Sequence, residues 1–206
     1  MSCYVSGGGR RCRGSGLALW IRFCVTEVGS LLARKMGWKF YDADDFHPLE
    51  NKMKMSQGTP LNDEDRHPWL CKLHEILIGE SAYAQNVVLA CSALKKIYRT
   101  VLTTGRSNIL QESSKQDKEV DLSSETIFIY LQGTMETISE RLHKRKDHFM
   151  PLTLLESQFK TLEPPSAPER FIVMNVEKNI SEIVTELQKH LESVSLYREE
   201  KCLPPL

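Results

Sequence analysis

The sequence predicts an α/β fold in which a parallel sheet of about five strands is covered by helices on both faces. Short apolar runs alternate along the chain with amphipathic stretches of helical length, which is the order of βαβ units. Two of these runs, Asn86–Cys91 and Ile127–Leu131, are almost continuously apolar, as strands buried on both faces are. The 206 residues are 41% hydrophobic and 26% charged, which is typical of a globular domain.

The first predicted strand lies within Leu17–Val25, which is apolar apart from Arg22. Thr26 is a candidate cap for the helix that follows, and Gly37 is its candidate stop because glycine tolerates the left-handed conformation. We expect residues 1–16 to be disordered. A single domain is predicted over residues 17–195, followed by a flexible tail over residues 196–206.

The other elements follow from the spacing of apolar residues. Further strands are predicted at residues 38–41, 86–91, 127–131 and 171–176. Helices are predicted at residues 64–84, 92–102, 134–144 and from residue 180 onward. Residues 111–125 are polar without an apolar face and predict an exposed loop.

Composition excludes several classes of protein. Lys and Arg number 27 and Asp and Glu number 27, so the chain lacks the basic excess of a general nucleic-acid binder. No apolar run has the roughly 20 residues that span a bilayer. The six cysteines show no CxxC spacing, which disfavours a zinc site and favours reduced thiols in the cytoplasm. The arginine-rich start leaves a mitochondrial presequence as an alternative.

Ligands of parallel α/β sheets bind beyond the carboxyl ends of the strands, so the residues after each strand are candidates for a site. Asp42, Asp44 and Asp45 follow the second predicted strand. Three carboxylates on one turn suit a site that is linked to a metal ion and accepts a hydroxyl proton. An Asp-rich turn, in which side chains bind nearby backbone N–H groups, explains them as well.

Two further segments carry charge at sheet or helix ends. Arg66 lies near a predicted helix start, where a cation opposes the helix dipole. An anionic or polyhydroxyl partner explains that position, and so does a salt bridge to Asp63 or Asp65. The basic run Arg141–Lys146 either complements the dipole of a helix end or forms a cationic flap over a polyphosphate.

Three segments, in this order, closely resemble the gluconokinase family of small P-loop sugar-acid kinases of the shikimate-kinase type. They are DADDFHPLENKMKMSQGTPLNDEDRHPWL, CSALKKIYR and RLHKRKDHFMPLTLLESQFKTLEPP. The resemblance implies a P-loop kinase-type three-layer sandwich with a small lid at about residues 141–160. It also implies ATP-dependent phosphorylation of D-gluconate to 6-phospho-D-gluconate, which feeds the pentose phosphate pathway. Mg²⁺ is the implied cofactor and a homodimer the implied assembly. The composition, and not the resemblance, predicts that there is no nucleic-acid or membrane partner.

The resemblance assigns roles around the Asp-rich turn. Asp42 resembles the carboxylate that orients magnesium through water. Asp44 resembles the carboxylate that contacts the substrate hydroxyl, and we expect it to accept the proton. His47 and Arg66 lie on the substrate-facing segments, with Arg66 as the partner of the gluconate carboxylate.

Later positions carry over in the same way. Ser92, Ala93 and Lys95 lie where the substrate-side helix of the family begins. Arg141 and Arg145 resemble lid arginines that bracket the nucleotide and its phosphates.

The start of the chain departs from the family pattern. The family opens with a strand and a glycine-rich loop, GxxGxGK[ST], that leads into the first helix. Aligned through Val28-Gly29, Val25 stands at the position of the phosphate-binding lysine, and no lysine precedes Lys35. Thr26 is a candidate for the hydroxyl that holds Mg²⁺.

This departure leaves more than one function open. Losing a donor aimed at developing charge costs on the order of a hundredfold in rate. The chain is therefore expected to be either a slow gluconokinase or an impaired relative that binds gluconate or regulates the normal protein by association. A kinase for another small hydroxy acid or a nucleoside is disfavoured by the PLNDEDRHPWL segment, which resembles the gluconate branch.

Overall fold

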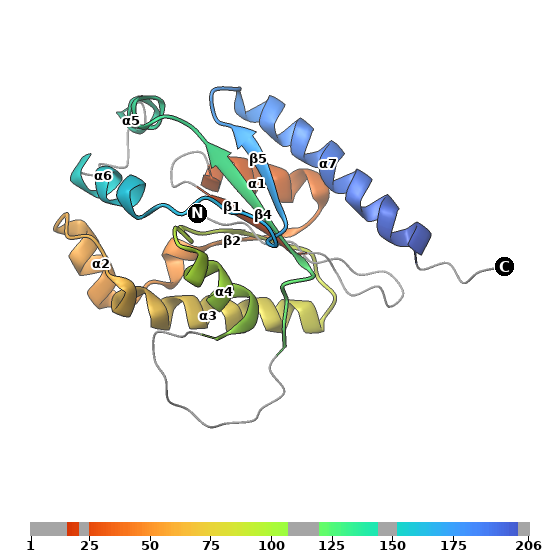
Figure 1. Ribbon diagram of the computed structural model, residues 1–206, viewed down its shortest axis with the longest axis horizontal. Coiled ribbons are helices and arrows are strands. Elements are labelled where there is room, and N and C mark those ends of the chain that lie inside the picture. The colour runs from red at the N-terminus through yellow and green to blue at the C-terminus, as the bar shows by residue number, and fades with distance from the viewer. Residues whose placement is uncertain (1–15, 21–24, 107–119, 144–151, 202–206) are drawn as a thin grey trace.

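The computed structural model describes residues 16–20, 25–106, 120–143 and 152–201 (Figure 1). All pairings in its five-stranded sheet are parallel, in the order β2-β3-β1-β4-β5. The strands are β1 (Gly16–Trp20), β2 (Lys39–Asp42), β3 (Val87–Ala90), β4 (Thr126–Gln132) and β5 (Phe171–Asn175). The predicted α/β class is confirmed.

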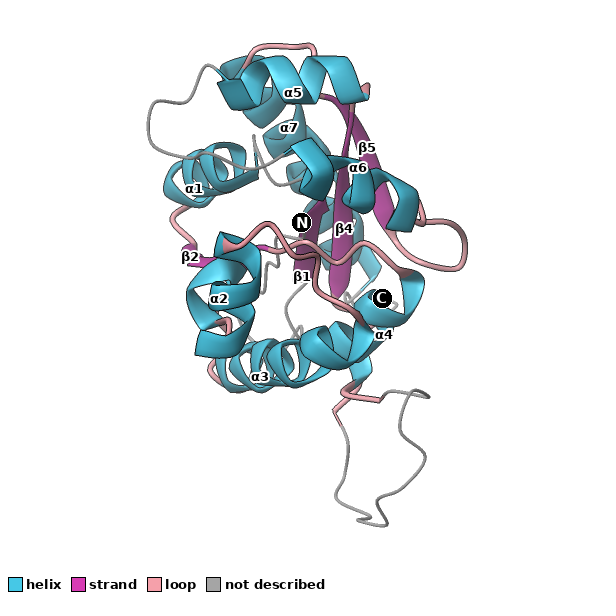
Figure 2. Cartoon of the chain, turned by 90° about the vertical axis from the view of Figure 1, so that its left-hand side faces the viewer, coloured by secondary structure: helices cyan, strands magenta, loops and turns pink. Residues whose placement is uncertain are grey.

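Helices cover both faces of the sheet (Figure 1). In chain order they are α1 (Val25–Met36), the 3₁₀ turn η1 (Ala43–Phe46), α2 (Leu49–Ser56), α3 (Asp63–Ala82), α4 (Lys96–Thr104), α5 (Met135–His143), α6 (Leu152–Thr161) and α7 (Ile180–Lys201). Helices α1 and α7 contact each other, as do α3 and α4. α2, α5 and α6 gather at one end of the molecule, which faces the viewer in Figure 2.

Alternation along the strands divides the core into two clusters. On β3, Val88 packs with α1 and α7, whereas Val87 and Leu89 pack with α3 and α4. Successive side chains of a strand point to opposite faces, so a continuously apolar strand is buried on both. This confirms the interpretation of Asn86–Cys91 as a buried strand.

Strand β1 fills the centre of the sheet between β3 and β4. It begins at Gly16, one residue inside the stretch that was expected to be disordered, while residues 1–15 lie outside the described part of the chain. Helix α1 then starts at Val25, one residue before the predicted cap Thr26. It ends before Gly37, which has a φ of 69°, as predicted for a glycine stop.

The predicted start of one helix is wrong. Helix α4 begins at Lys96 and not at Ser92, because Lys95 is in an extended conformation and the helix start is capped from a distant segment. Helix α7 runs through Lys201, so its last residues lie in the stretch from residue 196 that was predicted as a flexible tail. No glycine or proline interrupts the sequence between Ile180 and Lys201, so nothing local ends the helix earlier.

The predicted exposed loop over residues 111–125 is also wrong at its end. Residues 107–119 lie outside the described part of the chain, but Leu122 and Glu125 are buried. The Leu122 N–H donates to the Thr103 carbonyl at 2.8 Å, which holds the approach to β4 against the end of α4.

Candidate active site

The register of the sheet brings two predicted segments together. Asp42 pairs with Ala90 across β2 and β3, so Asp44 and Ser92 each lie two residues past the same rung. Both side chains therefore stand beyond the carboxyl edge of the sheet, where ligands of parallel α/β sheets bind.

Asp42, the last residue of β2, connects this strand to α1 through a hydrogen bond. Its Oδ2 accepts a hydrogen bond from the Thr26 hydroxyl at 2.9 Å, and its Oδ1 caps η1 by accepting from the Asp44 N–H at 3.0 Å. Burial raises the pKa of Asp42, and the neighbouring carboxylates of Asp44 and Asp45 add to this. The hydrogen bonds from the Asp44 N–H and the Thr26 hydroxyl act in the opposite direction.

Helix α3 fixes the turn that carries Asp44. The Trp69 indole Nε1 donates to the Ala43 carbonyl at 2.7 Å, and the His47 ring stacks on Trp69 with centroids 4.1 Å apart. The Asn51 amide lies 3.4 Å from His47 Nδ1, and His47 Nε2 faces Asp44 Oδ1 at 3.7 Å. If the amide donates to Nδ1, the proton of the neutral ring lies on Nε2, toward Asp44.

Arg66 is buried near the start of α3, with only 7% of its surface exposed. Its Nε donates to the Leu61 carbonyl and its Nη1 to the Ser92 hydroxyl, both at 3.4 Å. Its guanidinium lies 5.7 Å from the centre of the Tyr98 ring. The structure thus joins two predicted substrate residues, Arg66 and Ser92.

The acids near Arg66 are engaged by lysines. Both carboxylate oxygens of Asp63 accept from Lys95 Nζ at 2.7 Å, and Asp63 also accepts from the Tyr98 hydroxyl. Burial favours a higher pKa for Asp63, but the bonds from Lys95 and Tyr98 outweigh it and hold the pKa below its ordinary value. Lys95, a predicted substrate residue, therefore lies in the cluster around Tyr98 as the partner of Asp63.

The remaining predicted residues are placed differently. Ala93 is buried in the core cluster that α3 and α4 form with the sheet, so its side chain is a packing group. Arg141 donates to the Lys178 carbonyl at 3.2 Å, beyond β5 and on the opposite edge of the sheet from Asp42. The structure does not bring Arg141 to the cluster around Arg66, and Arg145 lies outside the described residues.

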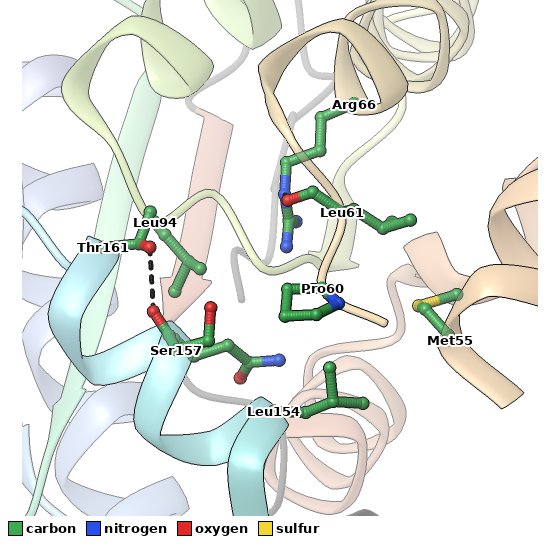
Figure 3. Close-up of a pocket in the computed structure, with 9 residues that line it drawn as sticks. Met55, Pro60, Leu61, Arg66, Leu94, Leu154, Ser157 and Thr161 are labelled. Carbon is green, nitrogen blue, oxygen red and sulfur yellow. Dashed lines mark hydrogen bonds between the residues drawn. The ribbon is translucent and has the colours of Figure 1, made fainter. Parts of the chain in front are cut away.

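A pocket opens beside Arg66 and is shown in Figure 3. Its apolar walls are Met55, Pro60, Leu61, Leu94 and Leu154. Its polar lining is Arg66, Ser157, Gln158 and Thr161. Helix α6 supplies Leu154 and the last three polar residues, so this helix, which the spacing did not predict, faces the start of α3.

Oxygen donors at the Thr26–Asp42 junction fit Mg²⁺. Among the described residues, no three His, Cys, Asp or Glu side chains gather as a metal cage. Mg²⁺ is commonly held by one or two carboxylates together with substrate phosphates and water, so the oxygens of Asp42 and Thr26 would be enough to hold it. The described part of the chain also contains no helix long and apolar enough to cross a bilayer.

Comparisons with known proteins identify the family to which the chain belongs. The family model for shikimate kinase matches residues 26–192. A Xenopus tropicalis protein named probable gluconokinase is 61% identical over 81% of this chain and 87% of its own length. A rat protein of the same name is 52% identical, with 81% and 91% covered. The crystal structure of a gluconokinase from Sinorhizobium meliloti matches with a TM-score of 0.73 at 33% identity, over 94% of this chain and all of that one. The chain therefore belongs to the shikimate-kinase-like family of kinases and, within it, to the gluconokinases.

Proposed function

We propose that this chain binds D-gluconate between Arg66 and Asp44 and transfers the γ-phosphoryl group of ATP to it, giving 6-phospho-D-gluconate. The observation that carries the proposal is the hydrogen bond from Arg66 to Ser92. Ser92 lies two residues past the Asp42–Ala90 rung on β3, and Asp44 lies two residues past the same rung on β2. An anion-binding group and a proton acceptor then lie beyond the same two strands, which is what phosphorylation of a sugar acid requires.

Two cations, Arg66 and Lys95, lie next to the Tyr98 ring. Lys95 binds the Asp63 carboxylate, and Arg66 is the proposed partner of the substrate carboxylate. Arginine is also suited to carboxylates because its planar fork can donate two parallel hydrogen bonds.

Asp44 is the proposed proton acceptor. The substrate hydroxyl oxygen bonds to the γ-phosphorus, the bond from that phosphorus to the bridging oxygen breaks, and ADP leaves with the electron pair. The hydroxyl proton passes to the Asp44 carboxylate. Trp69 and His47 hold the turn in place, so that Asp44 need not reorganise during the step.

Asp42, through water, and Thr26 are the proposed partners of Mg²⁺, which neutralises phosphate charge when bound. The groups expected to bind the phosphates of ATP are fewer in this chain than in the family pattern. Ile21–Cys24, which connect β1 to α1, contain no glycine or lysine, and Val25 begins the helix. We therefore infer a turnover at least about a hundredfold below that of a chain with the lysine-bearing loop.

One pair of proteins tests this proposal. The chain as it stands is compared with a graft in which the residues before Thr26 are replaced by the GxxGxGK loop. Gluconate binding is measured by calorimetry, and turnover by coupled detection of 6-phosphogluconate. Both proteins should bind gluconate, Arg66→Met should weaken that binding in both, and only the graft should turn over rapidly.

The contrary results are distinct. Absence of gluconate binding in both proteins contradicts the proposed substrate. Ordinary turnover by the ungrafted chain contradicts the need for the lysine loop. Gluconate binding without ATP binding in the ungrafted chain favours the impaired relative over the slow enzyme.

The location of the protein in the cell and its oligomeric state are also proposals. We infer a cytoplasmic enzyme, in keeping with the free thiols of Cys71 and Cys91. A homodimer is inferred from the family resemblance alone, and light scattering on the purified chain tests it.

A further inference from the structure

Helix α6 places a polar side chain in the pocket beside Arg66. Gln158 lines this pocket together with Arg66, although the two residues are more than ninety positions apart in the chain. The view in Figure 3 shows Arg66 on the α3 side of the pocket, with Leu154 and Ser157 of α6 on the opposite side. A ligand that binds Arg66 and extends into the pocket therefore meets α6.

The Gln158 amide has hydrogen-bonding capacity to offer such a ligand. It is half-buried, and within the described part of the chain no residue forms a hydrogen bond with its side chain. An amide both donates and accepts, as a hydroxyl does, so the two groups are matched partners. The neighbouring walls, which include Pro60, Leu61 and Leu94, are apolar and suit the C–H faces of a carbon chain.

The position of Gln158 relative to Arg66 is fixed by the end of α6. The Glu163 N–H donates to the Leu94 carbonyl at 2.8 Å, and the Glu163 carboxylate accepts from the Lys96 N–H at 2.7 Å. Arg99 Nη1 donates to the Glu163 carbonyl at 2.9 Å. These bonds attach the residues after α6 to the segment that carries Ser92, and so hold the C-terminal end of α6 on the same side of the pocket as Leu94.

We propose that Gln158 is a specificity-determining residue that hydrogen-bonds a hydroxyl of the sugar acid whose carboxylate Arg66 holds. This inference rests on the proposed function and adds to it a second point of recognition. The carboxylate alone does not distinguish one sugar acid from another. An amide held on the other side of the pocket from Arg66 favours sugar acids that have a hydroxyl on the carbon facing it.

The test uses gluconate and a set of gluconates that each lack one hydroxyl, with affinity measured by calorimetry on the full chain. Gln158→Met removes the amide at similar volume. Lys160→Met, an exposed position on the same helix, is the matched control. Gln158→Met should weaken gluconate binding about three- to tenfold, the usual effect of one hydrogen bond, and Lys160→Met should leave it unchanged.

The deoxy series separates recognition from packing. One deoxy compound should bind the parent chain more weakly than gluconate does, and should bind Gln158→Met as well as gluconate does. The inference is overturned if Gln158→Met binds every compound with the same affinity as the parent chain. It is also overturned if Gln158→Met loses the same factor of affinity for every compound, gluconate and all deoxy compounds alike. Thermal unfolding checks that the variant is folded, and Gln158→Leu repeats the test if it is not.

Failure of the substrate assignment looks different. If the parent chain does not bind gluconate, or Arg66→Met binds it unchanged, the proposed function fails whatever Gln158 does. If the parent binds and Arg66→Met loses binding while Gln158→Met does not, only the role of Gln158 is wrong.

Discussion

The Thr26 hydroxyl donates to Asp42 Oδ2 across 2.9 Å and so joins the first turn of α1 to the end of β2. This contact connects two strand ends that are not neighbours, because β3 lies between β2 and the β1 strand that leads into α1. The same carboxylate caps η1 through its other oxygen. Asp42 therefore holds both the start of α1 and the turn that carries Asp44 in place through its hydrogen bonds.

Thr26→Val should raise the pKa of Asp42 further. The hydroxyl bond favours the ionised carboxylate, whereas burial favours the neutral acid, so removing the bond leaves burial less opposed. Carbon-detected NMR titration of the Asp42 carboxyl measures the shift directly, without turnover. Thr26→Ser keeps a hydroxyl and should leave the titration near that of the parent. An unchanged midpoint in Thr26→Val would show that the bond does not form in solution.

Trp69→Phe should destabilise the fold by about 1–3 kcal/mol, because it leaves the Ala43 carbonyl without its indole donor while keeping an aromatic ring under His47. Urea unfolding measures the change. Trp38→Phe, which alters a partly buried ring on the other core cluster, is the control for loss of ring area. In the lysine-loop graft, Trp69→Phe should also lower kcat more than it raises the KM for gluconate, because the turn carrying Asp44 is displaced.

Much of the scaffold could be predicted because its signals are local. The strands at Val87–Ala90 and Thr126–Gln132 are apolar on both faces, and a run of such residues is informative without knowledge of what covers it. Helix α2 lacks that signal: Leu49 and Met53 are 70% and 53% exposed, and the residue it buries is Asn51. The apolar pair at helical spacing, Leu49 and Met53, therefore faces solvent and does not mark the face that α2 buries.

The site divides in the same way. Asp42, Asp44 and Ser92 could be predicted because they directly follow strands, and parallel topology alone brings those positions to one edge. The engagement of Lys95 by Asp63, the indole bond of Trp69 and the place of Gln158 in the same pocket as Arg66 depend on how α3, α4 and α6 pack. Contacts of this kind join residues far apart in the chain, and no spacing in the sequence indicates them.

Arg99→Met should cost about 3–5 kcal/mol of unfolding free energy. Arg99 forms two bonds to the Glu169 carboxylate, and the two side chains are 1% and 12% exposed. Removing the cation leaves a nearly buried carboxylate without its main partner. Urea unfolding tests this, and Arg99→Met combined with Glu169→Gln should lose less than the sum of the two single changes. Additive losses would contradict a coupled pair.

Asp65→Asn should destabilise the protein by about 1 kcal/mol at neutral pH and progressively less in acid. Asp65 accepts from Lys54 Nζ at 2.6 Å and from the Asn62 N–H at 3.1 Å, which completes the capping box of α3. The bond from Lys54, with that from Asn62, holds the pKa of Asp65 below its ordinary value despite some burial. A carboxyl whose pKa is lowered by folding stabilises the protein above its unfolded pKa of about 4, and this contribution is lost as the pH falls through the folded pKa.

The difference in unfolding free energy between parent and Asp65→Asn should therefore be constant from about pH 7 to 5 and shrink below about pH 4. Glu64→Gln removes an exposed acid from the same helix turn and controls for the dipole. A difference for Asp65→Asn that stays constant down to pH 3 would mean that its side chain acts through its shape and not through its charge.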